Sequence, residues 1–319
     1  MFNELQRQRR VNSQSHQTLI SPVADAPSSL KYHAMNDEQF IDLHAHTDAS
    51  DGSLTPTELV ERAAQHNLAA VGITDHDTIY GWDEALAAGE KHGVEIVPGV
   101  ELSTSYEGGR FHLLGYYVDP QSELIQVLER IQSARAGRND EIFDNLRELK
   151  MPLEENEVRA FAGENAQIGR PHFAQAMIAR GYVSSTQEAF DQYLADGKPA
   201  YATKAVLTPE DAVRLIREAG GVSVWAHPTL SRGFSFDELE AKLHEWKAWG
   251  LDGIETFYGR YTPEEAAWAK AMQQKFELLE SGGSDWHGAS KPDLELGVVN
   301  GGQRVPYRVL EAIKNHRRN

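Results

Sequence analysis

The chain has 319 residues, of which 31 are Lys or Arg and 48 are Asp or Glu, so its formal net charge is −17. An apolar fraction of 40% is enough for a sizeable core, which excludes wholesale disorder, and no apolar run approaches the ~18 residues of a membrane span. The absence of Cys excludes disulfides, thiolate metal sites and a thiol nucleophile. So acidic a chain repels long duplex nucleic acid and anionic membranes, and an anionic substrate therefore needs a local positive source.

Residues 1–39 are rich in Arg, Gln, Ser and Pro and show no hydrophobic periodicity. This composition predicts a disordered N-terminal tail, with a transit peptide as the less favoured alternative. The basic cluster of Arg7, Arg9 and Arg10 precedes no apolar block, so we expect no secretory signal and a cytoplasmic protein. Met35, just before the first apolar segment, is an alternative start of the protein.

Strand-like and helical segments alternate along the rest of the chain. The pattern predicts strands at residues 40–46, 69–74, 94–102, 111–118, 222–226, 253–257 and 276–281. It predicts helices at residues 55–66, 79–93, 208–219, 236–249, 263–274 and 308–315. The first of these helices has a complete start signal, with Thr55 as N-cap, Pro56 at the first position and Glu58 three residues after the cap. Such alternation predicts a parallel α/β sheet or barrel with seven strands.

Residues 119–206 interrupt this alternation, because they are helical and poor in strands and contain a long charged amphipathic run at 123–151. We expect this segment to be a helical insertion that forms a cap after the fourth strand. The barrel would then consist of residues 40–118 and 207–319.

His, Asp and Glu side chains, which are residue types that can bind metal ions, lie on or directly follow six of the seven predicted strands. Asp42, His44 and His46 alternate, so a strand places them on one face. Most of the others stand where strands end, the edge at which the loops of parallel α/β folds converge. They are Asp51, Asp75, His76, Asp77, Glu101, His112, His227, Asp285 and His287.

A turn, a cap or a solvated surface explains each of these residues alone, but not their joint position at successive strand ends. Imidazole and carboxylate ligands without sulfur suit Mn, Fe or Zn. Nine candidates are too many for one ion and suffice for two or three, with Asp51, Glu101 and Asp285 neutralising the cations. These nine are His44, His46, Asp51, His76, Glu101, His112, His227, Asp285 and His287. Such a centre can bind both the attacking and the leaving oxygen of a phosphoryl displacement. It can also lower the pKa of a bridging water to ~7.

The ordered motifs resemble those of the PHP superfamily, named for polymerases and histidinol phosphatases. They are DLHAHTDASDG at 42–52, ITDHD at 73–77, PGVELS at 98–103, WAHP at 225–228 and GSDWH at 283–287. The resemblance runs from the first strand to the C-terminus and implies a distorted (β/α)7 barrel with three metal ions. It assigns one ion to His44, His46, Glu101 and Asp285, a second to Glu101, His112 and His227, and a third to Asp51, His76 and His287.

Within the superfamily the chain is most similar to a bacterial branch with a helical insertion after the fourth strand. Its members include 3′,5′-nucleoside bisphosphate phosphatases and enzymes that trim short RNAs from the 5′ end. The shared motifs are IGRPHFA at 168–174 and GKPAY at 197–201. In these motifs the guanidinium group of Arg170 can bind a phosphate through two nitrogens, and Lys198 offers a point charge. Together with His172 these residues would be the local positive source.

The expected reaction is hydrolysis of a terminal phosphate or phosphodiester by a hydroxide that bridges the metals. We expect Asp285, His172 and Arg170 to be catalytic, with Arg170 stabilising the developing charge and His172 or a metal-bound water protonating the leaving group. Arg170 could instead pair with a carboxylate of the cap. Tyr201 and Tyr258 would face a base or sugar, or would pack at the rim.

Two segments depart from the bisphosphate-hydrolysing members of that branch. Residues 229–232 read TLSR where Gly-Arg-Tyr is usual, and residues 255–258 read ETFY where Glu-Val is usual. Arg232 or Arg260 could supply the missing phosphate contact. Asp42 and Asp75 stand beside ligands and would either orient imidazoles or make ordinary turn and strand-end bonds.

Three other functions compete with this interpretation. A histidinol-phosphate or sugar-type phosphomonoesterase is disfavoured by the cap motifs. A non-catalytic, metal-stabilised scaffold module is disfavoured, because scaffolding does not require the complete ligand set that this sequence contains. The sequence also shows no polymerase segment for such a module to support. An amidohydrolase-like enzyme is disfavoured by Arg170 and Lys198, since a neutral amide needs no anion clamp.

Overall fold

The computed structural model describes residues 39–107, 109–162, 168–195, 197–202, 206–231 and 233–317, without the side chains of residues 134–136. The predicted tail up to residue 38, the alternative start at Met35 and the side chain of Arg232 lie outside these residues. Residues 37–319 form one compact unit.

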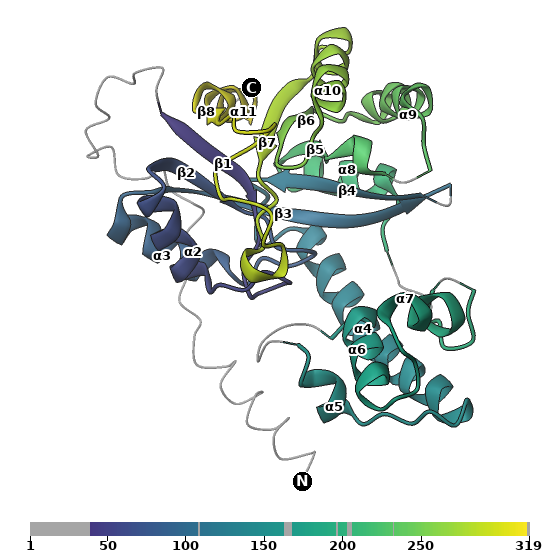
Figure 1. Ribbon diagram of the computed structural model, residues 1–319. Helices are drawn as coiled ribbons and strands as arrows, with labels where there is room; N and C mark the ends of the chain where they lie inside the picture. The colour runs from purple at the N-terminus through teal and green to yellow at the C-terminus, as the bar shows by residue number, and fades with distance from the viewer. Residues whose placement is uncertain are drawn as a thin grey trace. The chain divides into compact units, whose positions relative to one another are not determined.

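Eight strands form one sheet in the order β7-β6-β5-β4-β3-β2-β1-β8 (Figure 1). They are β1 (Phe40–Ala45), β2 (Leu68–Ile73), β3 (Glu95–Tyr106), β4 (Gly109–Tyr116), β5 (Val222–Ala226), β6 (Gly253–Tyr258), β7 (Leu279–Gly283) and β8 (Val305–Pro306). The chain after β7 also runs beside β1, because His46 N–H donates to Trp286 O at 2.9 Å and Asp285 N–H donates to His44 O at 2.8 Å. The sheet therefore nearly closes into a barrel.

The strand directions are parallel as expected for β1–β2, β2–β3, β5–β6 and β6–β7. The expectation of an all-parallel sheet is wrong at β4, which runs antiparallel to both β3 and β5. The physical reason is the short connection that pairs Tyr106 with Gly109, since only a hairpin and no crossover helix fits there. The two-residue strand β8 was not predicted, and it pairs antiparallel with β1.

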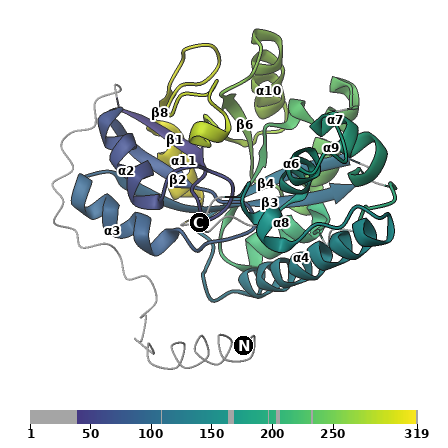
Figure 2. The same ribbon diagram turned by 60° about the horizontal axis from the view of Figure 1, so that its bottom comes forward.

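The predicted helices of the barrel are all present. They are α2 (Pro56–Gln65), α3 (Trp82–His92), α8 (Pro209–Glu218), α9 (Phe236–Trp249), α10 (Pro263–Lys275) and α11 (Arg308–Arg317). Helix α2 begins with the predicted capping box, in which Thr55 accepts from Glu58 N–H and the Glu58 carboxylate accepts from Thr55 N–H. Helices α2 and α3 lie side by side next to β1 and β2 (Figure 2).

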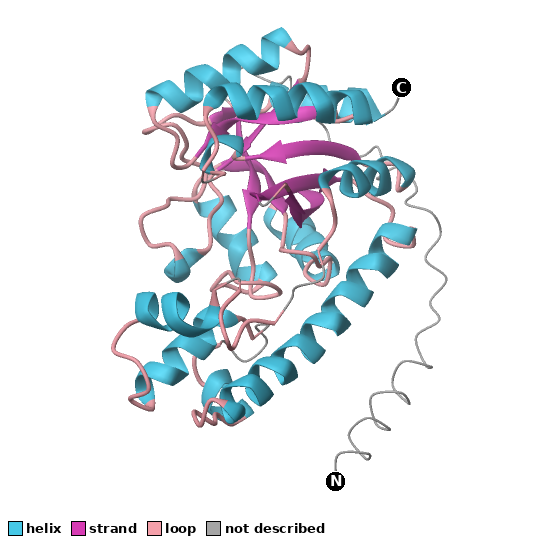
Figure 3. Cartoon of the chain, turned by 90° about the vertical axis from the view of Figure 1, so that its right-hand side faces the viewer, coloured by secondary structure: helices cyan, strands magenta, loops and turns pink. Residues whose placement is uncertain are grey.

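Between β4 and α8 the described residues form helices and no strand (Figure 3). These helices are α4 (Glu123–Glu148), α5 (Glu155–Arg159), α6 (Arg170–Ala179), α7 (Thr186–Ala189) and the π-helical η1 (Phe190–Leu194). They share a separate apolar cluster that includes Ile142, Phe173, Met177 and Leu194, all fully buried. Its role as a cap stays a prediction. In the part of the chain that the structure describes, no helix is long and apolar enough to cross a bilayer.

Candidate metal centre

The carboxyl ends of the parallel strands and the amino-terminal half of the antiparallel β4 bring the predicted ligands together. Within each of three groups, one nitrogen or oxygen atom from every member lies within 4.8 Å of the others. The groups are His44, His46, Glu101 and Asp285; His46, Asp51, His76 and His287; and His76, Glu101 and His112. His227 joins the third group through Glu101, because its Nε2 lies 3.0 Å from Oε1 of that carboxylate.

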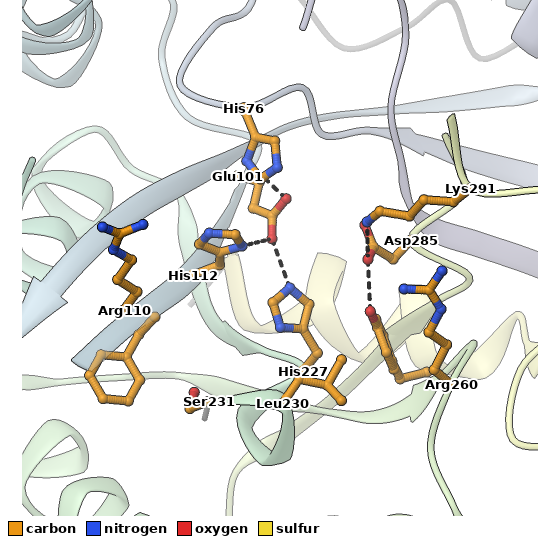
Figure 4. Close-up of a pocket in the computed structure, with 12 residues that line it drawn as sticks. His76, Glu101, Arg110, His112, His227, Leu230, Ser231, Arg260, Asp285 and Lys291 are labelled. Atoms are coloured by element: carbon orange, nitrogen blue, oxygen red, sulfur yellow. Dashed lines mark hydrogen bonds and ion pairs between the residues drawn. The ribbon is translucent and has the colours of Figure 1, made fainter. Parts of the chain in front are cut away.

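Glu101 is the centre of this arrangement and has no exposed surface. Its Oε2 lies 3.1 to 3.2 Å from imidazole nitrogens of three histidines, and its Oε1 lies 2.8 to 3.0 Å from those of two more. These histidines are His44, His46 and His76, and then His112 and His227. Figure 4 shows Glu101 with His76, His112 and His227. A carboxylate shared in this way is a candidate ligand for more than one cation.

The polar atoms of the cluster show what it is built to hold. Among the described residues, six buried ligand atoms make no hydrogen bond of acceptable geometry. They are Nε2 of His44, both ring nitrogens of His46, Nδ1 of His76, Oε2 of Glu101 and Nε2 of His287. An unsatisfied buried polar atom costs about 1–3 kcal/mol, so six on one site indicate a ligand. Nitrogen and oxygen donors without sulfur fit divalent ions such as Mn, Fe or Zn.

The charges of the cluster are mutually dependent. Burial raises the pKa of Glu101, but the surrounding imidazoles, His76 and His112 first, outweigh burial and hold that pKa well below its usual range. The same balance of burial against imidazoles lowers the pKa of Asp285. Burial lowers the pKa of His46, but the Asp285 and Glu101 carboxylates raise it to about 9. The two acids are therefore ionised, which is the form that binds a cation.

His76 differs from His46. Burial is the largest influence on it and, despite the nearby Glu101 and Asp51 carboxylates, lowers its pKa to about 3. Its imidazole is therefore already in the neutral form that binds a metal ion, whereas His46 has to release a proton when a metal ion binds.

Three non-glycine residues in or next to the ligand cluster have left-handed backbone, which is uncommon for such residues and typical of functional sites. They are Asp77 at φ 53°, His227 at φ 30° and Asp285 at φ 56°. Each is held by a hydrogen bond from its own N–H, to Glu101 O at 2.9 Å, to Glu255 Oε2 at 2.7 Å and to His44 O at 2.8 Å, respectively.

Asp42 and Asp75 were expected either to orient imidazoles or to make ordinary turn and strand-end bonds. They make bonds of the second kind. Asp75 accepts from Thr47 N–H at 2.8 Å and from the Ser50 hydroxyl at 2.6 Å, which holds the loop that leads to Asp51. Asp42 accepts from backbone N–H groups and from the Ser284 hydroxyl at 2.6 Å, so it joins β1 to the end of β7. Neither carboxylate hydrogen bonds to an imidazole among the described residues.

Glu255, which was not predicted as a site residue, contacts the imidazole of a predicted ligand. It is fully buried on β6, and its Oε1 lies 3.0 Å from Nδ1 of His44. The signal was present, because a Glu within the otherwise apolar start of a buried strand needs a partner.

A pocket of about 280 Å³ opens over the Glu101 side of the cluster (Figure 4). Besides ligands it is lined by three cations, Arg110, Arg260 and Lys291. Arg260 was one of two expected phosphate contacts, whereas Arg110 and Lys291 were missed. The signal for Arg110 was its spacing of two from His112, which puts both side chains on one face of β4.

Tyr258, an expected substrate contact, also lines this pocket. Its hydroxyl donates to Oδ2 of Asp285 at 2.7 Å, and its side chain is almost fully buried. Burial, and then the Asp285 carboxylate, raise the pKa of Tyr258, so it remains a neutral donor to that carboxylate.

The expected substrate residues of the helical segment do not line the pocket. Arg170 donates to Leu194 O at 3.0 Å and lies over the ring of Tyr201 at 5.4 Å. His172 is half-buried and its Nδ1 accepts from Gly169 N–H; burial lowers its pKa, against the pull of the Asp51 carboxylate.

Lys198 and Tyr201 are likewise absent from the pocket wall, and they are joined by a hydrogen bond from Tyr201 N–H to Lys198 O at 2.9 Å. The substrate roles of the residues in the helical segment stay predictions.

Comparison with known proteins places this geometry in a family. The PHP domain model matches residues 42–195. A 5′-3′ exoribonuclease from Haemophilus influenzae is 36% identical over 247 residues, which are 77% of this chain and 89% of that protein. The chain belongs to the PHP family.

Two further PHP relatives support the assignment. A 3′,5′-nucleoside bisphosphate phosphatase from Chromobacterium violaceum is 33% identical over 265 residues, 81% of this chain and 90% of that one. A solved structure from Bifidobacterium adolescentis, described as a metal-dependent phosphoesterase, has a TM-score of 0.72 and 33% identity over 86% of this chain and 96% of that chain. The PHP assignment, the α/β barrel and the class of metal-dependent phosphoric ester hydrolase expected from the sequence are thereby confirmed.

Proposed function

We propose that this PHP protein hydrolyses a terminal phosphate or phosphodiester of a small nucleotide, such as a nucleoside 3′,5′-bisphosphate, or of a short 5′-phosphorylated oligonucleotide. The observation that carries the proposal is Glu101, buried among five imidazoles at the base of a pocket lined by three cations. The names of the relatives point to the same substrates.

The three ligand groups support a centre of two or three divalent ions, with Mn, Fe and Zn as the candidates. We assign His44, His46, Glu101 and Asp285 to the first ion, Glu101, His112 and His227 to the second, and Asp51, His76 and His287 to the third. Divalent ions, when bound, supply positive charge to phosphoryl oxygens and an activated water at neutral pH.

The chain's own residues would orient this centre and the substrate. Tyr258 donates to one oxygen of Asp285 and so aims the other at His44 and His46. Arg170 would contact a phosphate from the helical segment, and His172, with its lowered pKa, would face the leaving group.

The site favours small substrates. A pocket of about 280 Å³ accommodates part of a nucleotide, and the net charge of −17 opposes the approach of long duplexes. Lys198 and Tyr201 would contribute further contacts to a phosphate and a base or sugar. Because nucleotides and short RNAs are found in the cytoplasm, we place the activity there.

A substrate panel tests the proposal. The Mn-loaded protein is assayed with a nucleoside 3′,5′-bisphosphate, a nucleoside monophosphate, histidinol phosphate and a 5′-phosphorylated trinucleotide. Turnover of the bisphosphate or the trinucleotide supports the proposal. Turnover of histidinol phosphate alone would indicate a histidinol-phosphate or sugar-type phosphomonoesterase instead. No turnover of any phosphoester with metal bound would favour a scaffold or an amidohydrolase.

A further inference from the structure

Lys291 brings a positive charge to the wall of the pocket, next to the metal ligands. It follows η3 (Gly288–Ser290), and its Nζ lies 2.8 Å from Oδ2 of Asp285. Its side chain is 28% exposed and lines the pocket (Figure 4). An incoming anion can therefore reach a cation that already touches a predicted metal ligand.

The two oxygens of Asp285 have different surroundings. Oδ2 accepts from the Tyr258 hydroxyl at 2.7 Å and from Lys291, whereas Oδ1 lies 3.5 Å from Nε2 of His44 and 3.2 Å from Nε2 of His46. Oδ1 is therefore the oxygen that faces the ligand group. If a cation binds to Oδ1, the negative charge of Asp285 is shared between that cation and Lys291. The carboxylate then neutralises the Lys291 ammonium group less, and this group attracts another anion more strongly.

Other cations near the site are held differently. Arg260 donates through two nitrogens to both carboxylate oxygens of Asp293, at 2.9 and 2.7 Å. Arg110 lies on β4 beyond His112, on the far side of the pocket from Asp285 (Figure 4). Lys291 is the cation of the pocket that contacts a metal-ligand carboxylate in the described structure.

The backbone around Lys291 is held in place. Its N–H donates to Gly288 O at 3.1 Å, and its carbonyl accepts from Leu294 N–H at 3.1 Å. Ala289 N–H donates to the Ser53 hydroxyl at 2.8 Å, which joins this loop to the loop after β1. A charge on an ordered loop needs little reorganisation to stabilise an anion.

We propose that Lys291 is a catalytic residue whose ammonium group contacts an oxygen of the phosphoryl group that is hydrolysed. It supplies, from the loop after β7, positive charge that so acidic a chain needs at its pocket. This inference rests on the proposed function, because it assumes a phosphoester in the pocket. As a charged donor Lys291 also stabilises the charge that develops on the phosphoryl oxygens.

Matched variants test the contact. Lys291→Gln removes the charge, and Lys291→Arg keeps it. Lys275→Gln removes a lysine at the end of α10 that pairs with Glu240 on α9 and does not line the pocket. For each variant, elemental analysis gives the bound metal, calorimetry gives orthophosphate affinity of the metal-loaded protein, and kinetics give kcat and KM.

We expect Lys291→Gln to retain its metal and to bind orthophosphate about tenfold to a hundredfold more weakly, with a matching loss of kcat/KM. Lys291→Arg should recover most of the affinity, and Lys275→Gln should behave as wild type. Unchanged orthophosphate affinity in metal-loaded Lys291→Gln would overturn the contact. Loss of metal with normal affinity per loaded site would also overturn it, since Lys291 would then only position Asp285.

The same experiment separates this inference from the proposed function. If the wild-type protein hydrolyses no phosphoester but its orthophosphate affinity depends on Lys291, the proposed function fails and the anion contact stands. If it hydrolyses phosphoesters and Lys291→Gln changes neither affinity nor kcat/KM, the function stands and the inference fails.

Discussion

Glu255 joins His44 to His227 through one buried carboxylate. Its Oε1 lies 3.0 Å from Nδ1 of His44, and its Oε2 accepts from the backbone N–H of His227 at 2.7 Å. Donation from Nδ1 leaves Nε2 of His44 as the atom that can bind a metal. The other bond holds His227 in its left-handed backbone conformation, so a single side chain positions two ligands assigned to different ions.

Replacement of Glu255 should therefore weaken metal binding. We expect Glu255→Ala to lower metal affinity about tenfold to a hundredfold, and Glu255→Gln to lower it less, because the amide still accepts from His227. Calorimetric titration of the metal-free protein measures this. Glu240→Gln, at a pair with Lys275 remote from the pocket, is the control. Wild-type affinity in Glu255→Ala would show that His44 needs no such support.

Asp285→Ala should abolish phosphoester turnover and reduce the bound metal. The variant loses a carboxylate that lies within reach of His44 and His46 and leaves Lys291 without its partner. Elemental analysis and a phosphate-release assay measure the two effects. Asp293→Ala is the matched control, since Asp293 pairs with Arg260 and belongs to no ligand group, and it should keep its metal. Full activity in Asp285→Ala would remove that residue from the centre.

Arg170→Ala should raise KM with the metal content unchanged, if Arg170 contacts substrate as proposed. The structure adds a second effect, because Arg170 donates to Leu194 O and lies over Tyr201. We therefore also expect a loss of about 1–3 kcal/mol in the free energy of unfolding. Kinetics and denaturant unfolding separate the effects. Lower stability with unchanged KM would leave Arg170 a purely structural role.

Chelation of the metals should lower the melting temperature. A ligand that binds only the folded state at about 100 times its Kd adds roughly 2.7 kcal/mol to the free energy of unfolding. For a chain of this size that corresponds to a shift of about 4–5 °C. Calorimetric melting with and without a chelator measures it, and Asp285→Ala should show a smaller shift. Equal melting temperatures in the wild-type protein would mean that these residues bind no metal in the folded state.

Most of the barrel could be predicted from the sequence, because buried strands and amphipathic helices leave local patterns of period 2 and 3.6. Those patterns say nothing of strand direction, so β4 was predicted as a strand but its antiparallel direction was missed, and β8 is too short to leave a pattern. The α2 cap was predicted in detail because a capping box lies within four residues.

The residues of the candidate site could likewise be predicted only in part from the sequence. His44, Glu101 and Asp285 could be predicted as candidate ligands because their residue types at strand ends are informative without any knowledge of distances. Glu255 and Lys291 were missed because their meaning lies in partners 211 and 6 residues away in the chain, with geometry that only the fold sets. Where Arg170 points depends on how the helical segment packs, which its sequence does not specify.

The hydrogen bonds that join β1 to the residues after β7 have a consequence for biosynthesis. Ligands on the two sides of this seam, such as His46 and Asp285, meet only when residues from opposite ends of the barrel have docked. A nascent chain still held in the ribosome before residue 287 has emerged thus lacks a complete ligand group for the first and third ions. High-affinity metal uptake should accordingly be a late event, which follows closure of the barrel.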